Sequence, residues 1–110
     1  MSIKIIKDMA EEMARKELKL ANEQYPYFAS NHEGWAVIIE EYFEAVTELK
    51  ECKEMVTAIQ ACVFEDKEQE ACAYALRLKQ YATFLACEGI QLAAMAQKFI
   101  DSDKARRDNE

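Results

Sequence analysis

The chain has 110 residues, and 51% of them are hydrophobic, which is enough for one domain with a modest core. Only two glycines and one proline occur, so the tight turns of an all-β fold lack their usual residues, whereas helix formers are plentiful. With 21 acidic and 14 basic residues the net charge is -7, which argues against nucleic acid as a partner. The composition predicts an all-α protein.

The sequence offers no membrane anchor and no metal-binding cysteine motif. No apolar run reaches the ~18 to 20 residues of a membrane span, and the N-terminal stretch MSIKIIKDMAEEMARKE carries charges where a signal peptide is apolar. We therefore expect a cytoplasmic protein with no membrane partner. The cysteines contain no C-x-x-C pair, so we expect reduced thiols at small core or near-core positions: Cys52, Cys62, Cys72 and Cys87.

Three helices are expected in chain order. Apolar residues at helical spacing predict the first over residues 3–24, which must end before Pro26 because proline disfavours helix at the residue preceding it. Ser30 followed by Glu33 forms an S-x-x-E capping box, which predicts the start of the second helix. Asp66, in the polar stretch EDKEQE, is the expected N-cap of the third.

Two apolar seams run along the second and third helices, with steps of three and four residues. The second helix is expected to bury Trp35, Ile38, Tyr42, Ala45, Leu49, Cys52, Val56, Ile59 and Val63. The third is expected to bury Tyr74, Leu78, Tyr81, Leu85, Glu88, Leu92, Met95 and Phe99. The segment after Ile100 is polar and should fray, so we expect a single domain over 1–101 and a tail over 102–110.

The apolar arc of the second helix spans ~160° on a helical wheel, which is wider than one neighbouring helix covers. We therefore expect a three-helix chain with a long antiparallel helix hairpin that dimerises into a helical bundle. The partner is a second copy of the chain, in a homodimer or a higher homo-oligomer.

Glutamates border this arc on the second helix, and they carry the main functional signal: Glu40, Glu41, Glu44, Glu48 and Glu51. A glutamate-rich helix face is usually solvated, which is the ordinary interpretation of Glu48 and Glu51. Glu88, however, occupies a seam position, where a buried carboxylate requires a cation, a proton or a hydrogen-bond network. Tyrosine hydroxyls, Arg77 or lysines of another chain are the alternatives to a metal there.

The expected hairpin places the two acidic pairs beside each other. If both helices rise equally from a turn at residue 66, then Glu41 and Glu44 lie level with Glu88 and Gln91. Three glutamates and one glutamine form an all-oxygen set that suits Mg²⁺ or Mn²⁺. The spacing therefore predicts a divalent cation site between the helices.

The segments PYFASNHEGWAVIIEEYFE and EGIQLAAMAQKFI resemble the phage and bacterial branch of the MazG-like all-α nucleotide pyrophosphohydrolases, over about residues 10 to 101. That family carries E-E-x-x-E on one helix and E-x-x-D on the next. Glu40, Glu41 and Glu44 supply the first motif. The second motif starts at Glu88 but ends at Gln91, where the family has aspartate.

The resemblance implies a helical dimer that binds Mg²⁺ and cleaves a nucleoside triphosphate between its α and β phosphates, releasing monophosphate and pyrophosphate. It implies that Glu41, Glu44 and Glu88, with Gln91, hold the metal. Glu40 would then be an outer group of the metal site or the base that orients the attacking water.

The same resemblance places the segment from Ser30 to Trp35 beside the nucleotide, with Asn31, His32 and Trp35 as candidate substrate contacts. The simpler interpretations are a capping loop for His32 and a core anchor for Trp35. Because Gln91 removes one negative charge from the site, metal binding should weaken. The alternative function is a non-catalytic helical module that binds a nucleotide or a protein and retains the fold.

Overall fold

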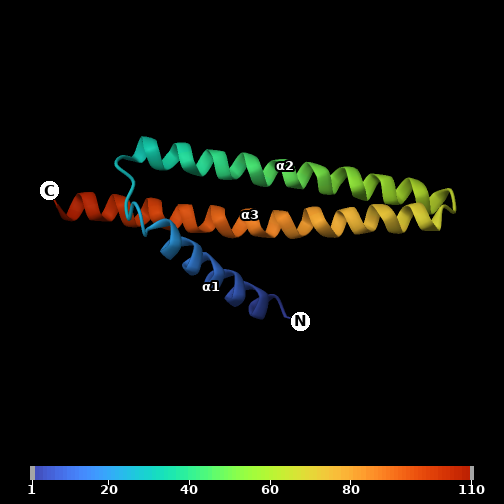
Figure 1. Ribbon diagram of the computed structural model, residues 1–110, viewed down its shortest axis with the longest axis horizontal. Helices are drawn as coiled ribbons and strands as arrows, with labels where there is room; N and C mark the ends of the chain where they lie inside the picture. Colours follow the sequence, from blue (N-terminus) through green and yellow to red (C-terminus); the bar gives the residue numbers. More distant parts are fainter. Residues whose placement is uncertain (1, 110) are drawn as a thin grey trace. The chain divides into compact units, whose positions relative to one another are not determined.

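The computed structural model describes residues 2–109, which form three helices (Figure 1). They are α1 (Ile3–Ala21), α2 (Asn31–Phe64) and α3 (Glu68–Asp108). No strand occurs in the described part of the chain, so the all-α prediction with three helices is confirmed. Within the same residues, no helix combines the length and apolar content that crossing a bilayer requires.

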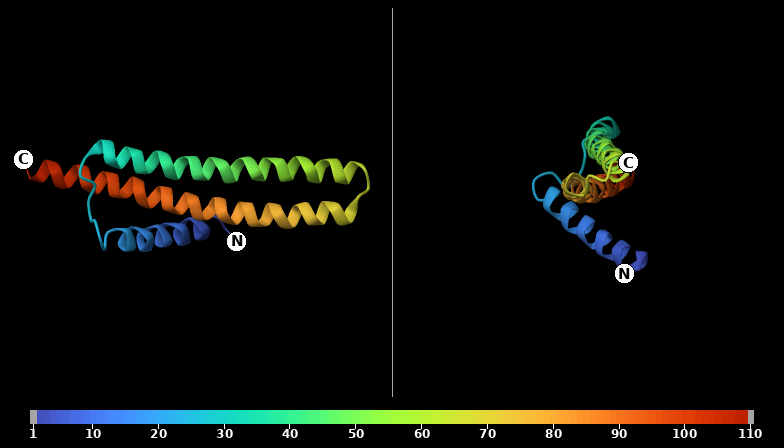
Figure 2. Two further views of the ribbon diagram at one scale, coloured as in Figure 1. Left: turned by 45° about the horizontal axis from the view of Figure 1, so that its top comes forward. Right: turned by 90° about the vertical axis from the view of Figure 1, so that its right-hand side faces the viewer.

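The chain divides into two compact units. The first comprises Met1–Tyr42 and Gly89–Glu110, and the second comprises Phe43–Glu88. Within the second unit, the last part of α2 and the first part of α3 lie side by side and are joined by a short turn (Figures 1 and 2). Both helices that carry glutamates of the expected metal site, α2 and α3, therefore contribute residues to this unit.

Serine hydroxyls cap the first two helices. Ser2 Oγ accepts a hydrogen bond from the Ile5 amide at 3.3 Å. Ser30 Oγ accepts one from the Glu33 amide at 3.1 Å, which confirms Ser30 as the cap of α2. Helix α1 ends at Ala21, three residues before the predicted boundary.

The turn falls at residue 66 as expected, but Asp66 does not cap α3. Its φ of 57° lies in the left-handed region. The Lys67 amide donates to the Cys62 carbonyl at 2.9 Å and the Asp66 amide to the Val63 carbonyl at 3.2 Å. This pattern is a Schellman motif, so Asp66 ends α2, and α3 begins only at Glu68.

The expectation of a frayed tail is wrong, because α3 continues to Asp108. Ser102 is almost fully buried and its Oγ accepts the Phe28 amide at 2.8 Å while donating to the Lys98 carbonyl at 2.7 Å. Arg106 donates to the Phe28 carbonyl at 2.9 Å. The polar residues of this segment therefore fix the loop before α2 to the last turns of α3.

Phe28 and Lys98 form the centre of this junction in the first unit. Both are buried, and the Lys98 ammonium lies 4.9 Å from the centroid of the Phe28 ring, within cation–π range. Gly34 lies against the same aromatic side chain, because a Cβ atom there would be 2.9 Å from Phe28 Cδ2. The loop and the first turn of α2 thus share one small core.

The inner face of α2 only partly matches the predicted seam. At every second seam position, the inner residue is the one that precedes the predicted residue in the sequence. Buried or half-buried residues include Ile38, Glu41, Ala45, Glu48, Cys52, Met55, Ile59 and Cys62. The predicted seam residues Trp35, Tyr42, Leu49, Val56 and Val63 are instead exposed. Helix α2 therefore turns two carboxylates inward and leaves its largest apolar side chains outside.

Two further expectations about burial need correction. Trp35 is 62% exposed, so it is not a core anchor of the chain. All four cysteines are free, but only Cys52 and Cys62 are buried, whereas Cys72 and Cys87 are exposed. The small-core interpretation holds for the two cysteines of α2 alone.

We expect Gly34→Ala to destabilise the protein by ~1–3 kcal/mol, because the new methyl group would meet Phe99 Cδ2 at 2.7 Å and Phe28 Cδ2 at 2.9 Å. Gly89→Ala is the matched control. Nothing lies within 4 Å of its Cβ position, so helix propensity alone should stabilise α3 by ~1 kcal/mol. Urea unfolding midpoints measure both, and equal effects of the two variants would contradict the tight contact at Gly34.

Candidate metal centre

Helices α2 and α3 supply the candidate site from residues one helical turn apart. Glu41 and Glu44 are i and i+3 on α2, and Glu88 lies on α3. One carboxylate oxygen from each of the three lies within 4.8 Å of the others. Glu44 and Glu88 both belong to the second unit, whereas Glu41 belongs to the first and lies three residues before Glu44 in the uninterrupted α2 helix.

This spacing is compatible with a shared divalent cation. Ligand oxygens on opposite sides of an ion are ~4.2 Å apart around Mg²⁺ and up to ~5.2 Å apart around Ca²⁺. The observed limit of 4.8 Å falls within this range, so rotamer adjustments of a few tenths of an ångström would suffice for Mg²⁺ or Mn²⁺. With oxygen donors alone, the group favours hard cations over zinc or copper.

The three carboxylates of the site differ in burial. Glu41 and Glu88 are half-buried, whereas Glu44 is exposed. A ligand or cation can therefore reach the group from the Glu44 side, while the two inner carboxylates lie in surroundings of lower dielectric, where electrostatic interactions are stronger.

The remaining motif residues lie next to this group along their helices. Glu40 is exposed and is not among the three carboxylates that converge. Gln91 is half-buried and follows Glu88 by one turn of α3, so its amide lies on the same face of that helix. Neither position adds a fourth carboxylate to the group of Glu41, Glu44 and Glu88.

Sequence reasoning was wrong about the burial of Glu48, and also of Glu51, which is half-buried as well. Glu48 was interpreted as solvated, yet it is half-buried, and its Oε2 atom is buried with no hydrogen-bond partner among the described residues. Its spacing of one heptad from Glu41 was the available signal, because residues seven apart share a helix face. Glu48 thus adds to the negative charge on the inner side of α2.

The three candidate substrate residues occupy the start of α2. Asn31 accepts a hydrogen bond from Arg106 and donates to Asp103 Oδ1 at 3.5 Å, so its side-chain amide links the loop to α3. His32 and Trp35 are exposed. All three residues are therefore exposed, but the side-chain amide of Asn31 is already engaged in the fold.

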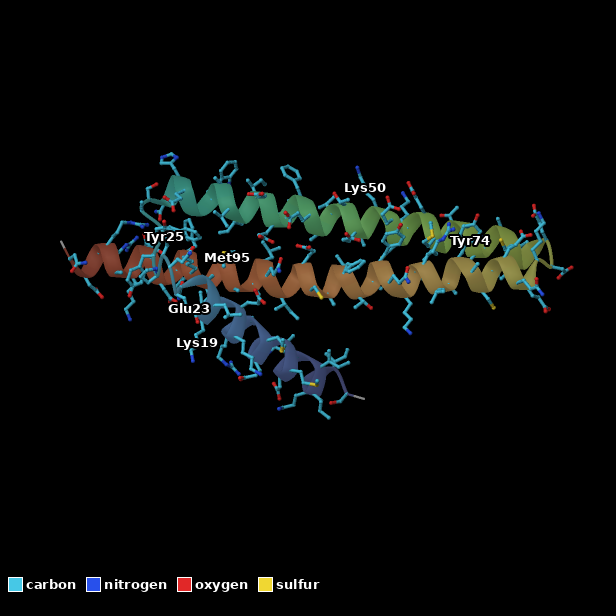
Figure 3. All side chains as sticks on the ribbon, viewed as in Figure 1. Lys19, Glu23, Tyr25, Lys50, Tyr74 and Met95 are labelled. Carbon is cyan, nitrogen blue, oxygen red and sulfur yellow. The ribbon has the colours of Figure 1, made fainter. Side chains whose placement is uncertain are left out.

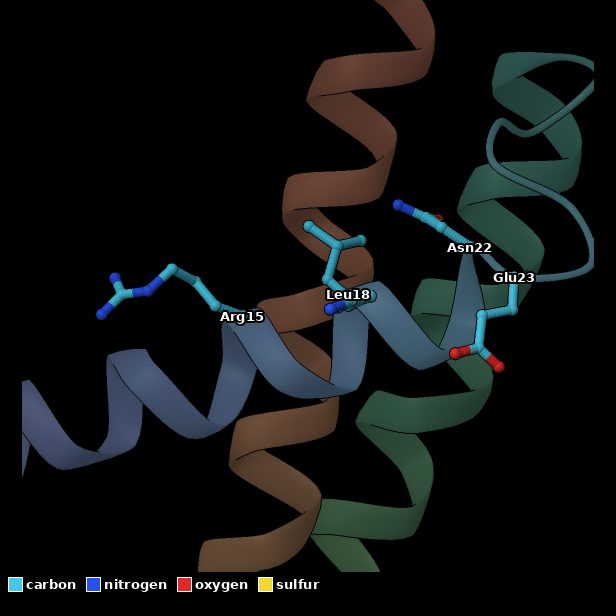
Figure 4. Close-up of a pocket in the computed structure, with 5 residues that line it drawn as sticks. Arg15, Leu18, Asn22 and Glu23 are labelled. Atoms are coloured by element: carbon cyan, nitrogen blue, oxygen red, sulfur yellow. The ribbon is translucent and has the colours of Figure 1, made fainter.

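A separate hollow of about 410 Å³ lies along the end of α1 (Figure 4). Its lining consists of Arg15, Leu18, Lys19, Asn22 and Glu23. The side chains are of mixed charge and come from a single stretch of the chain, so they form no convergent set for a metal or a reactive group. This hollow is a poorer candidate than the carboxylate group.

Comparisons with protein-family models, with curated proteins and with solved structures find no match to this chain. The functional argument therefore depends on the geometry of the site and on the residues that form it.

We expect Mg²⁺ or Mn²⁺ to raise the melting temperature by several degrees, since a ligand at 100 times its Kd stabilises a folded protein by ~2.7 kcal/mol. Glu44→Gln should abolish most of this shift. Glu54→Gln removes an equally exposed charge from the same helix outside the carboxylate group and should preserve it. Equal losses in both variants would indicate general charge screening instead of a site.

Proposed function

We propose that this protein is a Mg²⁺-dependent nucleoside triphosphate pyrophosphohydrolase that converts NTP or dNTP to the monophosphate and pyrophosphate. The observation that supports the proposal most directly is the convergence of Glu41, Glu44 and Glu88 within 4.8 Å. These are the positions at which the sequence resembles the MazG-like motifs, and the geometric reason for choosing them is independent of that resemblance.

In this proposal Glu41, Glu44 and Glu88 hold the cation, and Gln91 contributes its amide oxygen. A divalent cation held there would neutralise phosphate charge, which a protein of net charge -7 otherwise repels. The exposed Glu44 side provides access for the triphosphate.

Glu40 is the proposed base of the reaction. It is exposed beside Glu41 on α2, where its carboxylate is open to water and can orient or deprotonate the attacking molecule. His32 and Trp35 are exposed at the start of the same helix and are the proposed contacts to base or sugar. Trp35 offers an aromatic face for stacking.

The proposed active form is a homodimer in which long antiparallel hairpins of α2 and α3 form a bundle. The exposed apolar residues of α2 support association, because surfaces of this kind usually mark an interface. The second candidate is a non-catalytic nucleotide-binding or protein-interaction module, and it is favoured by the neutral Gln91 in place of a carboxylate.

Pyrophosphate release from a panel of NTPs and dNTPs tests the proposal. We expect turnover with Mg²⁺ or Mn²⁺ and a rate at least about tenfold lower for Glu41→Gln, because loss of a metal ligand weakens cation binding. Glu54→Gln is the control and should retain activity. If the wild type binds Mg²⁺ but is as inert as Glu41→Gln across the panel, the non-catalytic alternative is correct.

Gln91→Asp is expected to strengthen the site. The added carboxylate restores a negative charge one turn from Glu88, so the Mg²⁺ concentration for half-maximal thermal stabilisation should fall several-fold. Glu51→Asp, which keeps the charge on α2 unchanged, is the control. An unchanged or higher Mg²⁺ requirement in Gln91→Asp would show that residue 91 does not face the cation.

A further inference from the structure

We propose that Arg106 is a positioning residue for nucleotide binding, because its side chain sets the orientation of the start of α2. That end of the helix carries His32 and Trp35, the two proposed contacts to base or sugar. The inference rests on the proposed function and deepens it, since it assigns the group that presents these contacts to the nucleotide. All the residues on which it depends belong to the first unit.

The Arg106 guanidinium bridges the point at which the loop becomes helix α2. Its Nη1 atom donates to the Phe28 carbonyl in the loop at 2.9 Å, and its Nη2 atom donates to Oδ1 of Asn31, the first residue of α2. Figure 3 shows this junction beside the label of Tyr25, where side chains of the loop and of α3 come together. A guanidinium is planar, so its donors keep a fixed spacing and direction. One rigid group on α3 therefore holds both the loop and the helix.

Arg106 is the main restraint on the Asn31 side chain. The other contact of that side chain is to Asp103, whose Oδ1 atom accepts from the Asn31 amide group at 3.5 Å, beyond the usual range of an N–H···O hydrogen bond. Asp103 also pairs with Arg107 at 3.0 Å, so its carboxylate is shared. Arg106 is half-buried, whereas the side chain of Arg107 is 76% exposed.

The restraint on Asn31 reaches the proposed nucleotide contacts through the helix. Residues i and i+4 are neighbours on a helix surface, so Trp35 lies next to Asn31 along α2, and His32 follows Asn31 directly. The first amides of a helix lack partners within it, so this end frays if its side-chain contacts are lost. A nucleotide would then have to order His32 and Trp35 as it binds, which lowers its affinity.

Steady-state pyrophosphate release with Mg²⁺ tests this role. For Arg106→Ala we expect a KM at least about fivefold higher with kcat within about twofold of the wild type, because the three carboxylates are unchanged and only the presentation of the contacts is lost. Arg106→Lys keeps the charge and can reach one acceptor, so it should reverse part of the rise in KM. Arg107→Ala is the matched control, since it removes an equal charge from the next residue, and it should keep the wild-type KM.

An unchanged KM in Arg106→Ala, or an equal rise in Arg107→Ala, would overturn the positioning role and leave the proposed function in place. All variants are compared below their unfolding temperatures. Asn31→Ala leaves the contact between Arg106 and Phe28 intact, so it provides the same comparison if Arg106→Ala does not fold.

The emission of Trp35, the only tryptophan of the chain, reports on the start of α2 directly. Each variant is titrated with α,β-methylene analogues of the nucleoside triphosphates in Mg²⁺. We expect the double variant Arg106→Ala/Asn31→Ala to bind no more weakly than Arg106→Ala, because Arg106 acts through Asn31. Effects that multiply in the double variant would overturn this role. A wild type with neither turnover nor a nucleotide-dependent change in Trp35 emission would instead overturn the proposed function, and this inference with it.

Discussion

The proximity of Glu41, Glu44 and Glu88, whose carboxylate oxygens lie within 4.8 Å of one another, is the interaction on which the proposed function depends. Two unit charges 4.8 Å apart repel each other by roughly 3 kcal/mol at an effective dielectric near 20. Solvent screening, protons, hydrogen bonds or a cation can offset this repulsion. In the proposed function a divalent cation does so, because one ion would interact favourably with all three carboxylates at once.

Burial along α2 is unusual for a helix of this composition. The helix turns Glu41 and Glu48 inward and leaves Trp35 and Leu49 outside, which reverses the usual preference for apolar burial. Such an arrangement costs stability in an isolated chain. In the proposed function a cation bound by the carboxylates would remove part of this cost.

Much of the fold followed from local chemistry. Helical spacing, the Ser30 hydroxyl and the polar stretch around residue 66 located the three helices, and equal helix lengths from that turn placed Glu44 level with Glu88. The inner face of α2 could not be predicted from hydropathy. Two heptad patterns along α2, offset by one residue at every second position, have four residues in common: Ile38, Ala45, Cys52 and Ile59. The more apolar of the two patterns is the exposed one. Aspartate is common both as a helix N-cap and in left-handed turns, so the sequence could not decide which role Asp66 has. The tail was expected to fray because it is polar. It is ordered instead because Ser102 has a buried partner, Phe28, which is 74 residues away in sequence and could not be found from local pattern.

The turn at Asp66 also has a consequence for how proteins of this design diverge in length. Glu44 and Glu88 stand equally far along the chain from it, so a residue inserted into one arm alone would rotate one carboxylate by ~100° away from the other. Adding or removing a whole heptad in both arms would keep the carboxylates together. The stretch between the acidic group and the turn therefore behaves as a spacer, whose length can change in paired steps without separating the carboxylates.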